Sequence, residues 1–159
     1  MNALFALMGA VLIAAAISDV ISLRIPNYLS LALVALFAVY ALVAMPLADA
    51  LWHVLAGGVV LGIGMVVFAF GLFGGGDIKL LAAVALLLGW SLLLPLLFVI
   101  AMVGGILAIV IMTLRARGIM PLLVAMGLRG AIFERERAYV PYAVAIAAGW
   151  FIVGPLHLV

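Results

Sequence analysis

The sequence predicts an all-α, polytopic membrane protein with six transmembrane helices, and its composition is the first reason. Of 159 residues, 72% are hydrophobic and only 8% are charged, whereas a globular protein usually carries about 25% charged residues. So few charges cannot cover the surface of a soluble domain of this size. The second reason is that the apolar residues form six runs, each near the roughly 20 residues that a helix needs to cross the hydrocarbon core. We therefore predict one membrane-embedded domain over residues 1–159.

The six runs are separated by polar residues, glycine or proline, which are typical of loops. The first run resembles a signal peptide, but no Lys or Arg precedes it and Asp19 closes it, so we predict a helix that is retained. Gly89-Trp90-Ser91 and Pro95 divide the fourth run from the fifth. The predicted spans are about 3–20, 28–46, 51–72, 78–95, 97–114 and 140–157.

The basic residues set the predicted orientation. With six spans, every cation falls on one side of the membrane, and the positive-inside rule makes that side cytoplasmic, with both termini outside. A single helix in place of the fourth and fifth spans would put the later arginines opposite Arg24 and Lys79. In the polar segment 115–139, Pro121 predicts the start of a short helix on the cytoplasmic surface. The seven cations are Arg24, Lys79, Arg115, Arg117, Arg129, Arg135 and Arg137.

Two aspartates are the candidate functional residues. Asp19 ends the first span and Asp77 begins the fourth, so the predicted topology brings both to the same cytoplasmic boundary. A carboxylate at membrane depth is expensive and marks a functional site by default. Gly74-Gly75-Gly76 before Asp77 would let another peptide approach closely. The alternative interpretation is that Asp77 is an ordinary helix N-cap after a glycine turn.

Two carboxylates that share a site cannot both ionise cheaply, so one proton is held between them. The ionised acid can then draw a proton from water while the protonated acid donates to a carbonyl, which hydrolyses a peptide without a covalent intermediate. This chemistry needs no cofactor and no metal. The chain has no cysteine, and His53, His157 and Asp49 lack the spacing of a metal site. We expect no nucleic-acid partner, because the pI of about 9.4 reflects few charges.

The residues around the two acids have simpler expected roles. Pro26 extends the residue before it, and Asn27 is expected to cap the second span. Arg24 either sets topology or holds Asp19. Lys79 lies two residues after Asp77, and since such positions do not face each other on a helix, we expect it to reach the lipid headgroups.

Glycines in the third span have a structural interpretation. Gly58, Gly62 and Gly64 are expected to permit close packing between helices. Gly76 differs, because a methyl group there is expected to obstruct a substrate and to strain a backbone with positive φ. Gly75 is expected to tolerate the same change better.

Several stretches resemble one family. Gly74-Gly75-Gly76-Asp77 fits the G-x-G-D motif of intramembrane aspartic proteases, and its continuation 78–82 resembles that of the prepilin peptidases. Asp19, followed by Arg24-Ile25-Pro26-Asn27, resembles the first catalytic aspartate of that family and the turn after it. The stretch 140–147 resembles the start of its last helix, except that Ala143 stands where glycine is usual. We expect this departure to leave the acids untouched.

The resemblance implies an aspartic endopeptidase of the prokaryotic inner membrane. It would cleave the short basic leader of prepilin-like proteins, each carrying an apolar helix, at the cytoplasmic face, with Asp19 and Asp77 as the catalytic pair. With no cysteine and no room before the first span for a zinc segment, the chain resembles the short form of Flp or tight-adherence pilus systems. We therefore expect no N-methyltransferase activity. The loop and substrate-binding residues would be Gly74, Gly75, Gly76, Lys79, Arg24, Pro26 and Asn27.

Three alternatives stay open. One is a preflagellin-type peptidase with the same chemistry. Another is a small transporter or channel subunit in which Asp19 and Asp77 bind protons or cations. The last is a purely structural assembly subunit. The sequence leaves the particular substrate and the oligomeric state open.

Overall fold

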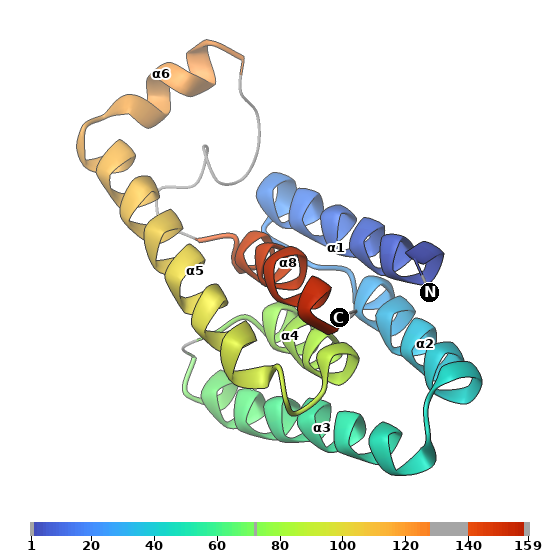
Figure 1. Ribbon diagram of the computed structural model, residues 1–159. Helices are drawn as coiled ribbons and strands as arrows, with labels where there is room; N and C mark the ends of the chain where they lie inside the picture. Colours follow the sequence, from blue (N-terminus) through green and yellow to red (C-terminus); the bar gives the residue numbers. More distant parts are fainter. Residues whose placement is uncertain (1, 72, 128–139, 158–159) are drawn as a thin grey trace.

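The computed structural model describes residues 2–71, 73–127 and 140–157, and these fold into helices without a strand (Figure 1). The all-α prediction is therefore confirmed for this part of the chain. The elements are α1 (Asn2–Ser22), α2 (Asn27–Ala44), α3 (Leu47–Ala69), α4 (Gly75–Leu88), α5 (Leu93–Ala116), α6 (Ile119–Ala125), α8 (Tyr142–Val153) and the 3-10 turn η1 (Gly154–His157).

Four helices, α1, α2, α3 and α5, are long and apolar enough to cross a membrane. The chain is thus a membrane protein. By contrast, α4 has 14 residues and α8 has 12. At 1.5 Å per residue these helices are roughly 21 and 18 Å long, shorter than a hydrocarbon core of about 30 Å. The prediction of six spans therefore remains a prediction.

The fourth and fifth predicted spans are separate helices, but the predicted boundary between them is wrong. The helix α4 ends at Leu88 because Gly89 takes a positive φ of 74° with ψ of −175°, a backbone conformation that only glycine adopts readily. A turn follows, and α5 begins at Leu93, with Pro95 in its first turn. Proline is tolerated there because the first N–H groups of a helix have no intrahelical partner. The break therefore lies at 89–92 and not near 96.

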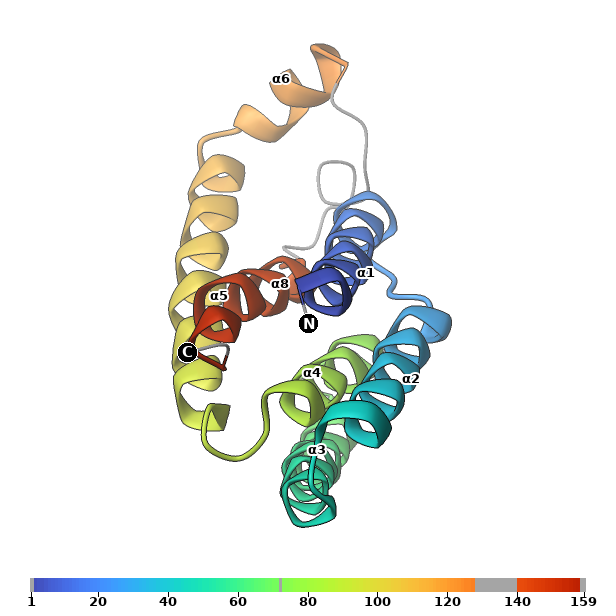
Figure 2. The same ribbon diagram turned by 45° about the vertical axis from the view of Figure 1, so that its right-hand side comes forward.

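The short helix α4 lies at the centre of the bundle, among α2, α3 and α8 (Figure 1, Figure 2). More than half of its residues are buried. Around it, α1 and α8 run antiparallel. At one end of this pair Phe5 stacks on Trp150 with ring centroids 4.7 Å apart, and at the other end Asp19 meets Ala143. Because of this arrangement, the end of α1 and the starts of α4 and α8 lie at the same end of the molecule.

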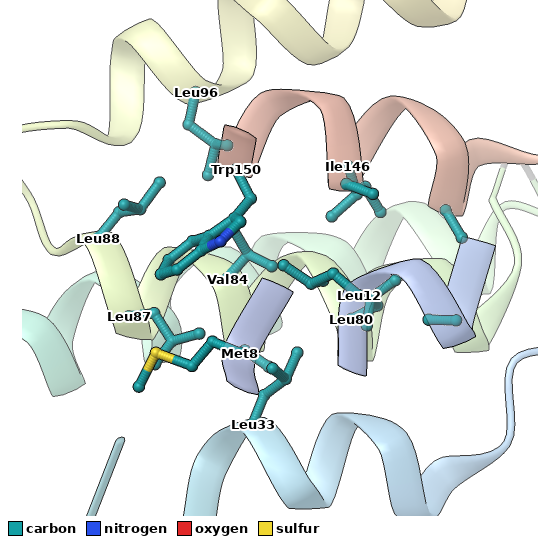
Figure 3. Close-up of a cluster of buried hydrophobic side chains, with 14 of the residues drawn as sticks. Met8, Leu12, Leu33, Leu80, Val84, Leu87, Leu88, Leu96, Ile146 and Trp150 are labelled. Carbon is teal, nitrogen blue, oxygen red and sulfur yellow. The ribbon is translucent and has the colours of Figure 1, made fainter. Parts of the chain in front are cut away.

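A cluster of buried apolar side chains joins α1, α2, α4, α5 and α8 (Figure 3). In lipid, helices associate through packing rather than through the hydrophobic effect, so this interdigitation is what holds the bundle together. It fixes the three helices α1, α4 and α8, which carry the groups described below. The labelled members are Met8, Leu12, Leu33, Leu80, Val84, Leu87, Leu88, Leu96, Ile146 and Trp150.

Glycines let α3 approach α4 closely, although not all the predicted ones do so. A Cβ added at Gly57 would lie 2.9 Å from the Cβ of Leu86 in α4. A Cβ added at Gly64 would overlap with the side chain of Ile78, also in α4. Gly57 and Gly64 are seven residues apart, which is about two turns, so they share a face. Gly58 and Gly62 have nothing within 4 Å. The packing prediction is correct for Gly64 and wrong for Gly58 and Gly62, which lie on another face.

Candidate active site

Asp19 and Asp77 line one pocket of about 300 Å³ at the end of α1 and the start of α4. A pocket of this size has room for water beside the two acids. The structure therefore brings the two predicted acids together. The other residues that line the pocket are Leu23, Arg24, Ile25, Gly74, Gly75 and Gly76.

Asp19 is buried, with 5% of its surface exposed. Its Oδ2 atom accepts a hydrogen bond of 3.1 Å from the backbone N–H of Ala143, the second residue of α8. The first N–H groups of a helix have no intrahelical partner and carry partial positive charge. The start of α8 therefore supplies a donor to a carboxylate that little solvent can reach. Position 143 contacts Asp19 through its backbone N–H, a group that alanine and glycine share, so the expectation that the Ala143 departure leaves the acids untouched stays a prediction.

Asp77 is the third residue of α4, and the N-cap is Gly74, so the N-cap interpretation of Asp77 is wrong. Its carboxylate accepts a hydrogen bond from the backbone N–H of Gly74, as an acid does at the third position of a capping box. Burial and, to a smaller extent, the charge on Asp19 raise the pKa of Asp77 to about 7, although the Gly74 N–H opposes both effects. Near neutral pH, Asp77 is therefore poised to hold or release a proton.

The three glycines before Asp77 are needed for close approach rather than for positive φ. Gly74 has φ of −73°, and Gly75 and Gly76 begin α4, so the expectation of a positive φ at Gly76 is wrong. A Cβ added at Gly74 would lie 2.8 Å from Oδ2 of Asp77, and one at Gly76 would lie 3.2 Å from the Cβ of Ile25. At Gly75 the nearest atom, in an aromatic ring, would be 3.4 Å away. Gly74 and Gly76 are therefore the tight positions.

The turn after α1 forms another wall of the pocket. Leu23 ends α1 in a left-handed conformation with φ of 51°, and its N–H donates to the carbonyl of Asp19. Such a conformation costs about 1–3 kcal/mol for a residue with a side chain. The Ser18 hydroxyl donates to the carbonyl of Arg24 at 2.9 Å, and the Ser22 hydroxyl donates to the carbonyl of Ser18 at 2.7 Å. These hydroxyl bonds hold the turn and place Arg24 at the pocket.

Pro26, Asn27 and Lys79 do not line the pocket. Pro26 is the extended N-cap of α2, and Asn27 is the first residue of that helix. The Nζ atom of Lys79 donates a hydrogen bond of 3.0 Å to Oδ1 of Asn27. The expectation that Asn27 caps α2 is therefore wrong, because the N-cap is Pro26. The expectation that Lys79 reaches the headgroups stays a prediction. Together these two residues tie the start of α4 to the start of α2.

Two aromatic residues, Phe73 and Tyr142, directly precede the residues whose N–H groups bond the two acids, and their rings are in contact. Phe73 precedes Gly74, Tyr142 precedes Ala143, and the two rings are 5.0 Å apart between centroids with an interplanar angle of 44°. Neither ring nor the Ala143 N–H was predicted as part of the site. The resemblance of the stretch 140–147 to a family motif was the one signal in the sequence that pointed to α8.

The opposite end of the bundle has a second pocket, of about 510 Å³, which includes Asp49, His53 and Trp90 among its lining residues. The Nδ1 atom of His53 lies 2.9 Å from the carbonyl oxygen of Leu86, so this histidine is tied to α4. Among the described residues, no group of three His, Cys, Asp or Glu side chains could hold a metal ion. The predicted cations Arg129, Arg135 and Arg137 lie outside the described residues.

Comparison with known families gives one match. A model described as the type IV leader peptidase family matches residues 6–109, more than half of the chain. The matched stretch contains both Asp19 and Asp77. No curated protein and no solved structure matches the chain.

Proposed function

Because this chain belongs to the type IV leader peptidase family, we propose that it is a membrane-embedded aspartic endopeptidase with Asp19 and Asp77 as its catalytic pair. Membership in a peptidase family supports proteolysis as the reaction. The single observation that carries the aspartic mechanism is that these two acids, from α1 and α4, line one pocket. The substrates would be prepilin-like proteins with a short basic leader and an apolar helix.

The mechanism follows from one proton shared between two carboxylates. The ionised acid takes a proton from a water, and the hydroxide formed attacks the scissile carbonyl carbon while the protonated acid donates its proton to the carbonyl oxygen. As the tetrahedral intermediate collapses, the acid that took the water proton donates it to the leaving amine, and the other acid takes a proton back from a hydroxyl group of the intermediate, so the pair again holds one proton. The raised pKa of Asp77 and the burial of Asp19 support this sharing. Because the two acids titrate as a pair, the proton belongs to both.

The side of cleavage is proposed from the basic residues. Arg24 lines the acid pocket, and Lys79 lies two residues after Asp77. Arg115 and Arg117 follow the part of α5 whose apolar side chains pack with Val20 of α1, so they lie at the same end. The positive-inside rule then favours cleavage at the cytoplasmic face of the inner membrane, with both termini outside.

The test uses the purified protein in detergent or liposomes with a synthetic prepilin-like substrate. We expect Asp19→Asn and Asp77→Asn each to reduce leader cleavage by at least about a hundredfold, because each acid has its own part in proton transfer. Asp49→Asn is the matched control, since Asp49 lies at the opposite end of the bundle, and it should cleave like the wild type. Substantial cleavage by either of the first two variants would remove that acid from the mechanism. A preflagellin-like substrate, assayed in parallel, separates the two leader classes.

A further inference from the structure

The two acids are held in the same way by two distant parts of the chain. Each carboxylate accepts a hydrogen bond from the backbone N–H of a residue that directly follows an aromatic residue. Gly74, which donates to Asp77, follows Phe73. Ala143, which donates to Asp19, follows Tyr142. The position of each donor is therefore coupled to the position of the ring before it.

The two rings are in contact with each other, with centroids 5.0 Å apart. Aromatic rings at this separation attract each other beyond the effect of the area that they bury. Tyr142 is also held from α5, because a Cβ added at Gly104 would lie only 3.2 Å from its Cε1 atom. The ring of Tyr142 thus lies between α5 and Phe73. Phe73 lies in the short connection between α3 and α4, directly before the N-cap of α4.

We propose that the contact between Phe73 and Tyr142 positions the two catalytic carboxylates, by fixing the Gly74 N–H relative to the Ala143 N–H. This inference rests on the proposed function, because it assumes that Asp19 and Asp77 act as a pair. The apolar cluster fixes the bodies of α4 and α8, whereas the ring contact fixes their first residues. Geometry at that end matters, since a misplacement of about 1 Å can cost a hundredfold in rate.

The experiment replaces each ring with leucine and compares the cleavage rate of that variant with the rate of a variant that keeps an aromatic ring. Phe73→Leu and Tyr142→Leu should each lower kcat by about tenfold to a hundredfold, with KM changed much less, when rates are expressed per folded molecule. Phe73→Tyr and Tyr142→Phe keep the ring contact and should restore most of kcat. The double variant F73L/Y142L should be no slower than the slower single variant, because both changes remove one contact. The matched control is Phe5→Leu, which breaks the Phe5–Trp150 stack at the opposite end of α1 and α8 and should leave kcat unchanged.

The pH dependence of kcat gives a readout that a merely structural role would not move. If the leucine variants loosen the acid pair, the coupling between the carboxylates weakens, and the two apparent pKa values of the rate profile should move toward each other. Wild-type kcat and an unchanged pH profile in the folded leucine variants would overturn the inference. An equal loss of kcat in Phe5→Leu would also overturn it. If Asp19→Asn and Asp77→Asn cleave normally in the same assay, the proposed function fails instead.

Discussion

At the scale of single residues, each acid combines burial with one backbone donor. Burial disfavours the charge on a carboxylate, whereas an N–H group at a helix start favours it. At Asp77 burial is the larger effect, so its pKa is raised to about 7 despite the Gly74 N–H. The donor to Asp19 is the Ala143 N–H of another helix, so the stabilisation of the Asp19 carboxylate depends on the position of α8 relative to α1. Proton exchange at the two acids therefore depends on the positions of the first residues of α4 and α8, which supply the two N–H donors.

The raised pKa of Asp77 predicts a pH dependence of stability. Its ordinary pKa is 3.8, and in the fold it is about 7. Between these values the folded state binds more protons than the unfolded state, so the free energy of unfolding should fall as pH rises from about 4 to about 7. Thermal unfolding in detergent at several pH values measures this. Asp77→Asn should lose much of the dependence, while Asp49→Asn should keep it. Identical pH dependence in Asp77→Asn and the wild type would contradict the assignment.

The three glycines before Asp77 should rank unequally in activity. Gly74→Ala should lose most cleavage, because the new methyl group lies 2.8 Å from Oδ2 of Asp77 and must displace that carboxylate. Gly76→Ala should lose less, since Ile25 can move by a few tenths of an ångström. Gly75→Ala should lose least, because its nearest neighbour is at an ordinary contact distance of 3.4 Å.

Leader cleavage at matched protein levels, together with a melting curve for each variant, checks this ranking. The side chain of Asp77 can rotate away from a new methyl group, so Gly74→Ala should fold even as it loses activity. Equal and mild losses from all three variants would reduce Gly74–Gly76 to a simple turn.

At the scale of elements, the sequence predicted what depends on composition and missed what depends on packing. The four long helices follow from apolar runs of membrane-spanning length. The end of α4 was predicted too late in the chain: Gly89-Trp90-Ser91 was recognised as an interruption, but apolar residues continue on both sides of it, and hydropathy cannot detect the positive φ of Gly89 that ends the helix. Protein surrounds α4 on several sides, so its length need not match the bilayer. Likewise, the bond between Lys79 and Asn27 joins two helices whose orientation only the fold defines.

Packing between α3 and α4 predicts opposite effects at two adjacent glycines. Gly57→Ala should destabilise the fold by about 1–3 kcal/mol, as overpacking does, because its Cβ would lie 3.1 Å from the carbonyl oxygen of Ala82. Gly58→Ala has nothing within 4 Å, and it should be neutral or stabilise α3 by up to about 1 kcal/mol. Thermal unfolding in detergent compares the two. Equal destabilisation by both would show that α3 packs on another surface as well.

At the scale of the whole molecule, the sequence predicted that Asp19 and Asp77 lie close together, but it did not predict the contacts that hold them in position. Counting spans puts the end of α1 and the start of α4 at one membrane face, which needs only topology. The bond from Ala143 to Asp19 joins residues 124 positions apart, and the ring contact of Phe73 with Tyr142 depends on the same long-range packing. No local pattern encodes either contact. The sequence therefore identified the acids as candidates but not the backbone groups that hold them.

The last prediction concerns the orientation of the chain in the membrane. Because the chain has no cysteine, a single introduced cysteine can report which side of the membrane it faces. A single cysteine can be placed at Met126, after α6 and 71% exposed, or at Ala48, in the first turn of α3 at the opposite end. If the acid pocket faces the cytoplasm, a membrane-impermeant thiol reagent added outside intact cells should label Ala48→Cys and not Met126→Cys. In inverted vesicles the pattern should reverse. Labelling of both residues from one side would break the six-span topology, and with it the argument that cleavage occurs at the cytoplasmic face.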